Sequence, residues 1–519
     1  MDKKTTVLVV LNGYGILSPQ NDSGDDKDRF IEDLMETCPY SKCLASGMAV
    51  GLPNGQMGDS YVGHINIGAG RIVYQDLSRI TKDIQDGTFF ENERLKNAVS
   101  NIKNKDSALH LCGLISDGGI HSHLSHLYAL LEFAKRQDIR RVYVHCFMDG
   151  MDSAPDKGAF YLERLQAKMR EIGVGEIATV SGRYYAMDRG NNYDRIKLVY
   201  LAMTEGEGIK AANADEAIRD SYAAGDYDTF IKPTVIVNGG VPVGIINDDD
   251  TVIFFNFRPD RSRELAHAFC DDEFRSFKRE KKLDIFFATL TEYDVNIEDK
   301  LVIYDEPVPE NAFGKWLETN ELTQLRLAES ENALFVTYAF NGYTDEVYDG
   351  EERMILPSPK LSADEYRPEM SSVEITDRLC RAMASHSYDF ILCDYAALDI
   401  AGHTTDMENR NKAMETIDNE IKKVCKCADE EQAFLFICST HGNIEKFRDK
   451  KWKQEKSTAH TTNPIPFIFY DKSGTFSLKN GGCLADIVPT IIDFMGYEKP
   501  KEMTGKSLLI KDHENTGSF

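Results

Sequence analysis

Ser60 stands in a glycine-rich stretch that suits a nucleophile. Gly58 and Gly63 flank it, and Gly68 and Gly70 follow within ten residues. Small residues let the backbone bend sharply and present a hydroxyl group to a bulky substrate. A serine among glycines is otherwise an ordinary turn residue. The stretch therefore makes Ser60 a candidate nucleophile whose role depends on what the rest of the chain offers.

Two histidines and an aspartate could hold a divalent metal ion. Asp399 and His403 stand four residues apart, which is one helical turn or a tight loop, and His460 comes shortly before an apolar run. One carboxylate with two imidazoles suits Mn²⁺ or Zn²⁺. The plain alternative is a capping aspartate with two hydrogen-bonded histidines.

A second group of polar residues follows expected strand ends. Asn12 comes after the apolar run 7–11, and Thr440 and His441 follow the run 434–439. Side chains at the carboxyl ends of parallel strands gather at one edge of an α/β sheet. With Ser60 these residues could form a second polar cluster, which contains no carboxylate.

A set of charged residues in the middle of the chain could bind an anionic substrate. Arginines suit this role because the guanidinium fork matches phosphate and carboxylate groups. The arginines that follow expected strands are Arg183, Arg189, Arg258 and Arg261, and two further loops of this kind contain His121 and Asp152. The alternative for each arginine is a surface ion pair with Asp188 or Asp260.

Alternating strand and helix patterns predict two α/β domains. In the middle block the strands are 108–115, 141–148, 177–180 and 252–256, and the helices are 123–136, 158–172 and 196–203. This alternation is typical of a parallel sheet covered by helices. A second run comprises 334–340, helices 372–385, 410–425 and 484–495, and strands 390–394, 434–439 and 466–470. We expect residues 1–76 and 308–519 to form one domain and residues 79–300 to form a domain inserted into it.

Composition limits the classes of partner and compartment. The 519 residues, of which 42% are hydrophobic, are enough for two cores. No apolar run reaches the length of a membrane span, and the first residues lack the apolar segment of a signal peptide. Eleven scattered cysteines without a CxxC pair predict reduced thiols in a cytoplasmic protein. A net charge of −25 argues against nucleic acid or an anionic membrane as a partner.

Taken together, these motifs give a specific family resemblance. The chain resembles the cofactor-independent (2,3-bisphosphoglycerate-independent) phosphoglycerate mutases nearly from end to end. The matching stretches are 56–64, 66–77, 116–123, 181–189, 254–261, 357–360, 368–370, 402–403, 458–464 and 502–507.

The resemblance implies a fold, a reaction and a role for each candidate residue. It implies a phosphatase domain of alkaline-phosphatase type, split in sequence, with an inserted phosphotransferase domain. The reaction would interconvert 3-phosphoglycerate and 2-phosphoglycerate through a phosphoserine at Ser60. Asp399, His403 and His460 match one Mn²⁺ site, and a monomer is the family's usual state. The residues that match the substrate-binding set are His121, Asp152, Arg183, Arg189, Arg258 and Arg261.

The chain departs from the family pattern at the second metal site. The family uses an aspartate after the first strand, the serine and an Asp–His pair, whereas this chain has Asn12 and Thr440 in place of the two carboxylates. Ser60 and His441 remain. Asparagine and threonine oxygens bind a divalent ion weakly, so we expect one intact Mn²⁺ site and one degenerate site. Asp59, beside the serine, could supply a replacement carboxylate.

Three more positions differ in chemistry. Asn332 stands where the family has a lysine, Met151 where it has an arginine, and Ala397 where it has an asparagine. A metal ion and a lysine are the groups that could stabilise a serine alkoxide. The sequence therefore predicts that binding of a small phosphorylated acid survives better than the mutase reaction. The alternatives are a working mutase, an inactive phosphoglycerate-binding or regulatory relative, and a one-metal phosphatase.

Overall fold

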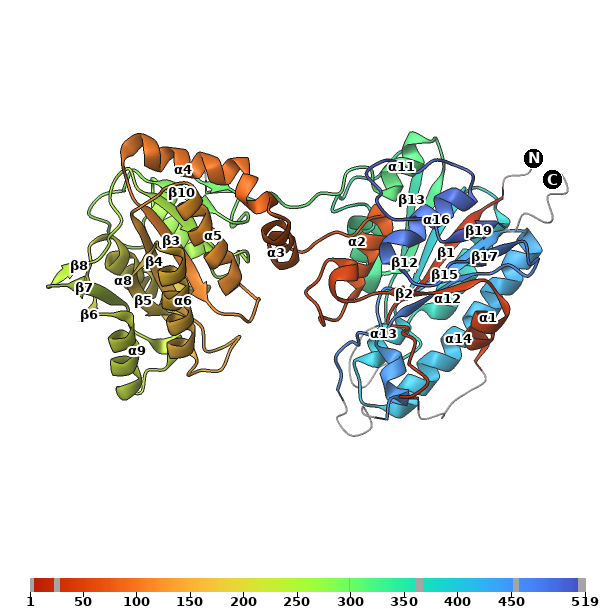
Figure 1. Cartoon of the computed structure of the whole chain (residues 1–519). Coiled ribbons are helices and arrows are strands. Elements are labelled where there is room, and N and C mark those ends of the chain that lie inside the picture. Colours follow the sequence, from red (N-terminus) through yellow and green to blue (C-terminus); the bar gives the residue numbers. More distant parts are fainter. Residues whose placement is uncertain (1–3, 23–28, 298, 360–366, 451–456, 512–519) are drawn as a thin grey trace. The chain divides into compact units, whose positions relative to one another are not determined.

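The chain forms two α/β units. The structure, a computed structural model, describes residues 4–22, 29–297, 299–359, 367–450 and 457–511. Unit 1 comprises Met1–Gln75 and Pro307–Phe519, and unit 2 comprises Asp76–Glu306 (Figure 1). The chain leaves unit 1 once and returns once, so unit 2 is an insertion into a unit that is split in sequence.

A mixed sheet lies at the centre of unit 1. Its first strand in sequence, β1, lies between β14 and β15 and runs parallel to both, whereas β16 runs antiparallel to β15 and β2. Among the described residues the order of the sheet is β13 (Glu351–Leu356), β12 (Gln324–Glu329), β14 (Phe390–Tyr395), β1 (Thr6–Leu11), β15 (Phe434–Cys438), β16 (Ile465–Phe469), β2 (Tyr40–Leu44) and β18 (Gly482–Cys483). A separate pair is formed by β17 (Phe476–Leu478) and β19 (Leu509–Lys511).

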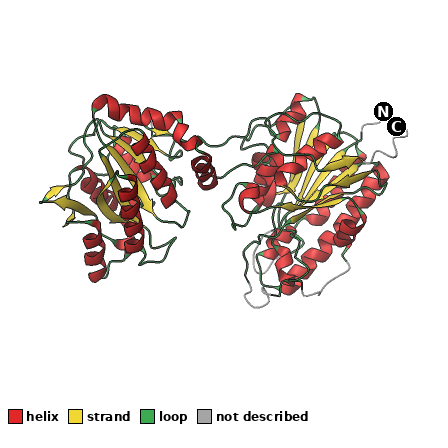
Figure 2. Ribbon diagram, viewed as in Figure 1, coloured by secondary structure: helices red, strands yellow, loops and turns green. Residues whose placement is uncertain are grey.

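Helices cover both faces of this sheet (Figure 2). Because successive strand residues point to opposite faces, β1 contributes Val7, Val9 and Leu11 to one core and Leu8 and Val10 to the other. The first core includes α1 (Phe30–Thr37), α12 (Ser372–Ala384), α13 (Ala397–Gly402) and α14 (Met407–Glu431). The second includes α2 (Ser60–Ala69), α11 (Phe313–Thr319) and α16 (Ile487–Phe494).

Unit 2 has its own sheet, also covered by helices. In order, its strands are β11 (Leu301–Val302), β10 (Phe286–Thr289), β9 (Thr251–Phe254), β3 (Leu109–Ile115), β4 (Val142–Met148), β5 (Glu176–Gly182), β7 (Thr234–Asn238) and β6 (Ile209–Ala211), with β8 (Val241–Pro242) beside β7. Its helices are α3 (Asp76–Asp86), α4 (Glu93–Lys105), α5 (Leu124–Arg136), α6 (Gly158–Ile172), α7 (Arg183–Ala186), α8 (Tyr193–Thr204), α9 (Ala214–Ala223) and α10 (Arg263–Cys270).

Most of the predicted strands and helices are present, with three differences. The strand β12 is missing from the prediction because it buries the polar residues Gln324, Arg326 and Glu329. These residues interrupt the apolar pattern by which a buried strand is recognised in a sequence. Residues 334–340 contain a π-helix, Phe335–Ala339. The sheet of unit 2 is not wholly parallel, because β7 runs antiparallel to β5.

The prediction of reduced thiols is wrong for one pair of cysteines. Cys380 in α12 and Cys427 in α14 form a disulfide, with Cα atoms 5.7 Å apart, whereas the other nine cysteines are free. Their 47-residue separation hides the pair from a search for local spacings. Within the described ranges, no helix combines the length and apolarity needed to span a membrane.

Candidate functional site

Asp399, His403 and His460 bring their ligand atoms together in unit 1. These atoms all lie within 4.8 Å of one another. The Oδ1 atom of Asp399 lies 3.6 Å from His403 Nε2 and 3.4 Å from His460 Nε2. Asp399 and His403 are placed by the short helix α13, which follows β14, and His460 precedes β16. The three residues thus come from two segments at one edge of the sheet.

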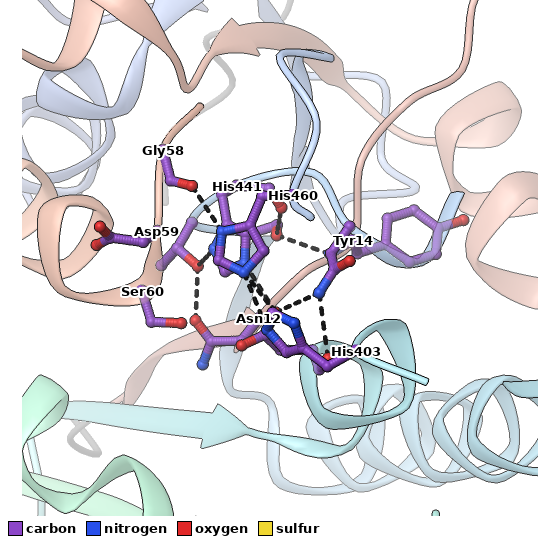
Figure 3. Close-up of polar contacts among 12 residues, drawn as sticks. Asn12, Tyr14, Gly58, Asp59, Ser60, His403, His441 and His460 are labelled. Carbon is purple, nitrogen blue, oxygen red and sulfur yellow. Dashed lines mark hydrogen bonds and ion pairs between the residues drawn. The ribbon is translucent and has the colours of Figure 1, made fainter. Parts of the chain in front are cut away.

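The two histidines are oriented as metal ligands usually are. His403 donates from Nδ1 to the carbonyl oxygen of Thr458 at 3.2 Å, and His460 donates from Nδ1 to that of Gly58 at 2.8 Å (Figure 3). These bonds leave both Nε2 atoms facing Asp399. A backbone carbonyl on the far ring nitrogen is the common way to fix a ligating imidazole. The donor set therefore fits one divalent metal ion.

Asp399 is held ionised by its surroundings. His441 Nε2 lies 2.9 Å from its Oδ1 atom, and Asn443 donates from Nδ2 to the same atom at 2.7 Å. Burial alone would raise the pKa of this carboxyl group, but the hydrogen bonds from His403, His441 and His460 hold it well below the usual value. A carboxylate that stays charged in a buried position is suited to a cation.

Ser60 is the first residue of α2, which corrects the interpretation of the glycines around it. Gly63 and Gly68 lie within this helix and serve close packing. A Cβ atom on Gly63 would lie 2.3 Å from the Cβ atom of Thr440, and one on Gly68 would lie 2.0 Å from the carbonyl oxygen of Phe340. Gly63 thus lets α2 approach Thr440, just after β15, and Gly68 lets it approach Phe340; Ser60, at the start of this helix, is only 5% exposed.

Asp59 serves as the cap of α2. Its Oδ1 atom accepts a hydrogen bond from the backbone N–H of Val62 at 2.7 Å, as an N-cap residue does. Figure 3 shows its carboxylate directed away from the histidines. The expected replacement carboxylate is therefore engaged elsewhere in this structure.

The second polar cluster contains a carboxylate that the sequence interpretation missed. Asp394, near the end of β14, is fully buried and accepts a hydrogen bond from Asn12 Nδ2 at 2.5 Å. Thr440 Oγ1 donates to Asn12 Oδ1 at 2.6 Å, and His441 Nδ1 lies 2.9 Å from the same hydroxyl oxygen. His441 thus connects this cluster to Asp399.

These side chains do not fit a second divalent ion. The oxygen of Asn12 is engaged by Thr440, and its amide N–H groups face Asp394. Asn332 also donates from Nδ2 to Asp394. Neutral groups that satisfy one another offer a cation few free oxygen ligands. Of the predicted degenerate site, Asn12, Thr440 and His441 therefore belong to one hydrogen-bond network in this structure, and Ser60 contacts it through its carbonyl oxygen, which faces His64.

In unit 2, Arg183 is the buried centre of the predicted anion-binding set. It donates from Nη1 to Asp149 Oδ1 at 2.5 Å and to Asp152 Oδ2 at 2.8 Å. Burial opposes ionisation of Asp149, but hydrogen bonds from Ser116, the Asp152 N–H and Arg183 hold its pKa below the usual value. Asp149 thus fixes both Arg183 and the loop that carries Asp152.

The remaining members surround Asp260. Arg258 Nε lies 3.1 Å from Asp260 Oδ1, Arg189 donates to Oδ2 at 3.5 Å, and His121 Nδ1 lies 3.6 Å from Oδ1. Arg189 and Arg258 remain half-exposed, with 59% and 51% of their side chains accessible. Arg189 and Arg258 thus form the ion pairs with Asp260 that the sequence offered as an alternative, whereas Asp188 pairs with Arg195.

Two pKa shifts describe the charge in this region. Burial, followed by the charges of Arg183 and Arg189, lowers the pKa of Arg261, so these three guanidinium groups lie close enough to repel one another. Burial, together with the Arg183 charge, lowers the pKa of His121 to about 4, so its ring is neutral near pH 7. Concentrated positive charge beside a neutral imidazole can bind a polyanion and hydrogen-bond it.

Sequence reasoning missed several residues that hold these sites. Asp394 and Asp149 could have been found, because each stands at or just after an expected strand on the functional edge. His64 stands one helical turn after Ser60 and contacts Asp394. No sequence pattern pointed to Lys446. This lysine is buried and donates to the carbonyl oxygen of Ala459 at 2.8 Å, and burial lowers its pKa to about 8.

Comparison with known proteins gives consistent matches. Residues 80–295 match the family model described as "BPG-independent PGAM N-terminus (iPGM_N)". The chain is 49% identical over 514 residues to a 2,3-bisphosphoglycerate-independent phosphoglycerate mutase of Lachnoclostridium phytofermentans, covering 98% of this chain and 100% of the relative. It is 47% identical over 519 residues to that of Acetivibrio thermocellus, with the same coverage.

A solved structure shares the fold. A crystal structure of Leishmania mexicana phosphoglycerate mutase at low cobalt concentration aligns with a TM-score of 0.56 and 26% identity, over 98% of both chains. The predicted fold class, an α/β domain split in sequence with an inserted α/β domain, is confirmed. On the identity and coverage of its relatives, the chain belongs to the 2,3-bisphosphoglycerate-independent phosphoglycerate mutase family.

Proposed function

We propose that this protein binds phosphoglycerate and interconverts its 3- and 2-isomers through phosphorylated Ser60, at an impaired rate and with one Mn²⁺ ion. The observation that carries the proposal is the bond from Thr440 to Asn12, which engages two side chains that would otherwise face a second cation. The arginines of unit 2 support retained binding, because they keep their positions around Asp152 and Asp260. The protein would act as a monomer, with no nucleic-acid or membrane partner.

The two units would have different roles: unit 2 would bind the substrate and unit 1 would carry the reacting serine. In unit 2, Arg183 and Arg261 bind the phosphate or carboxylate oxyanions, and half-exposed Arg258 and Arg189 complete the charge around the substrate. His121, neutral near pH 7, offers a hydrogen bond without adding charge. Unit 1 would provide the serine and the metal ligands. When bound by Asp399, His403 and His460, Mn²⁺ supplies positive charge that stabilises an anionic oxygen.

The transfer at Ser60 can be written with atoms in balance. A bond forms between Ser60 Oγ and phosphorus while the bond from phosphorus to the 3-oxygen of glycerate breaks. The serine proton ends on the released 3-hydroxyl group. The glycerate then turns, its 2-oxygen takes the phosphoryl group, and its hydroxyl proton returns to Ser60. The N-terminal end of α2, where Ser60 lies, favours the negative charge of the phosphoserine.

Binding and turnover should be measured separately. Isothermal titration with 3-phosphoglycerate and Mn²⁺ should show binding to the unchanged protein and to Ser60→Ala. Arg258→Ala should weaken it by at least about tenfold, the loss of one charge-assisted contact. Arg263→Ala, which changes an exposed arginine nearby, is the matched control. Absence of binding to the unchanged protein would refute the proposal.

Turnover should be slow and should depend on the serine. An enolase-coupled assay should detect conversion of 3-phosphoglycerate, and Ser60→Ala should abolish it. Conversion as fast as that of a relative such as the Lachnoclostridium enzyme, measured alongside, would contradict impairment.

A phosphoglycerate-binding protein without turnover is the second candidate. It is favoured by Asn332, a neutral side chain whose amide is held against Asp394. Binding with no conversion, even at high protein concentration, would select it. Release of inorganic phosphate without isomerisation would instead indicate a one-metal phosphatase.

A further inference from the structure

Asp394 is a fully buried carboxylate whose two oxygens are both engaged. Oδ2 accepts from Asn12 Nδ2 at 2.5 Å and lies 3.0 Å from His64 Nε2. Oδ1 accepts from Asn332 Nδ2. The donors come from the end of β1, from α2 and from the segment after β12. A buried charge is stable only when it is paired and hydrogen-bonded, and Asp394 meets both conditions with side chains alone.

His64 balances the charge of this carboxylate. Its Nδ1 atom lies 2.8 Å from the carbonyl oxygen of Ser60, and its Nε2 atom faces Asp394. A carbonyl oxygen only accepts hydrogen bonds, so Nδ1 carries a proton, and the contact between Nε2 and Oδ2 needs a second proton. Both side chains of the pair are inaccessible to solvent.

The network closes toward the metal ligands. Asn12 turns its oxygen to Thr440, and the Thr440 hydroxyl lies against His441, whose other ring nitrogen contacts Asp399. Asn12, Asn332 and His64 thus surround Asp394, and Thr440 engages the side-chain oxygen of Asn12. Figure 3 labels Asn12 and His441 of this network together with the nearby Ser60.

We propose that the pair of His64 and Asp394, with Asn12, Asn332 and Thr440, takes the place of a second divalent cation. Asp394 is then a positioning residue that holds the two asparagine amides. It would also oppose a second metal ion even if carboxylates were restored at positions 12 and 440. This inference rests on the one-ion part of the proposed function. Metal counting needs neither substrate nor turnover, so phosphoglycerate binding and turnover can fail while the inference stands, and the variants at Asp394 test its role apart from the activity.

The unchanged protein gives the first test. Titration with Mn²⁺ alone, followed by calorimetry and by elemental analysis after gel filtration, should give one tightly bound ion per chain. Two ions bound with similar affinity would overturn the inference whatever the variants do.

Exchange variants give the second test. Asn12→Asp with Thr440→Asp restores two carboxylates but sets one of them against Asp394, since the side chains of residues 12 and 394 are 2.5 Å apart. Adding Asp394→Asn removes this repulsion and preserves the hydrogen bond with donor and acceptor exchanged. We expect the triple variant to bind a second Mn²⁺ ion, and the double variant to bind it at least tenfold more weakly.

Controls separate a local effect from misfolding. Each variant should retain the first Mn²⁺ ion and a cooperative thermal transition, and Asp394→Asn alone should still bind one ion. Equal binding of a second ion by the double and triple variants would show that Asp394 does not oppose it. If the double variant does not fold, the number of Mn²⁺ ions bound by the triple variant is compared with the number bound by Asp394→Asn alone. A triple variant that still binds only one ion overturns the inference.

Discussion

The Nη1 atom of Arg183 lies 2.5 Å from the Oδ1 atom of Asp149, and both side chains are buried in unit 2. Asp149 also accepts hydrogen bonds from the Ser116 hydroxyl group and from the N–H groups of Met151 and Asp152. One carboxylate thus orders the ends of three neighbouring strands. The guanidinium group that the substrate would meet is held before any substrate arrives.

Asp149→Asn should therefore destabilise unit 2. Removing one charge of a buried pair leaves the other without compensation, at a cost of about 3 kcal/mol or more. The low pKa of Asp149 means that this contribution is complete above the unfolded-state pKa and is lost as the pH falls through the folded value. Urea unfolding at pH 7 should show the loss. Asp156→Asn, at an exposed aspartate, should leave the midpoint unchanged, and equal midpoints for both variants would contradict the role given to Asp149.

Mild acid should also weaken unit 2 through His126. This histidine is buried in α5, where its Nε2 atom lies 2.9 Å from Thr81 Oγ1, and burial lowers its pKa to about 3. Below about pH 6.5 the imidazole of His126 is protonated in the unfolded chain but stays neutral in the folded chain. The free energy of unfolding therefore falls by about 1.4 kcal/mol for each unit by which the pH is lowered. Unfolding free energies at pH 7, 6 and 5 should show a shallower slope for His126→Gln; an identical slope would exclude His126 as a source.

Asp399→Asn should strongly reduce the stabilisation of unit 1 by Mn²⁺. The unchanged protein should gain about 2.7 kcal/mol of unfolding free energy at a metal concentration one hundred times Kd. The variant loses the negative charge shared by His403 and His460, and its Mn²⁺ affinity should fall by more than about tenfold. Thermal unfolding with and without Mn²⁺ measures both effects. Asp377→Asn, at an exposed residue of α12, should keep the full metal-dependent shift, and a shift retained in Asp399→Asn would place the metal elsewhere.

Gly68→Ala should destabilise unit 1, although alanine usually stabilises a helix. The added Cβ atom would lie 2.0 Å from the carbonyl oxygen of Phe340, which is backbone and cannot turn aside. Forcing the two segments apart should cost about 2–3 kcal/mol, against a propensity gain of about 1 kcal/mol. Urea unfolding and Ser60 reactivity should both report the shift of α2. A more stable variant would show that α2 can move freely.

The sequence predicted the elements whose residues follow simple periodicities. Strands such as β3 and β15 are mostly apolar runs, and polar residues follow them, so the candidate metal cluster and the arginines near Asp260 could be proposed in advance. The strand β12 could not, because its buried Arg326 is hydrogen-bonded by Gln324 on the same strand and by Asn341, which only the fold brings near.

The candidate site shows the same limit in a sharper form. Asn12 and Thr440 indicated missing carboxylates, but no local pattern connects Asp394, some 380 residues away, with Asn12. Register along β1 and β14 creates that contact, since Leu11 lies opposite Tyr395. The contacts of the cluster around Asp394 thus depend on strand pairing between distant parts of the chain. The spacing of residues along the sequence was enough to propose the cluster of Asp399, His403 and His460.

The central place of β1 has a consequence for how the protein is made. This strand leaves the ribosome well before its two neighbours in the sheet, which begin at Phe390 and Phe434. All of unit 2 emerges in between, as one continuous segment that can fold while synthesis continues. Until then the six buried residues of β1 have no sheet to join. A nascent chain halted after Glu306 would pair a finished unit 2 with an unprotected apolar strand, which is the form that chaperones would be expected to bind.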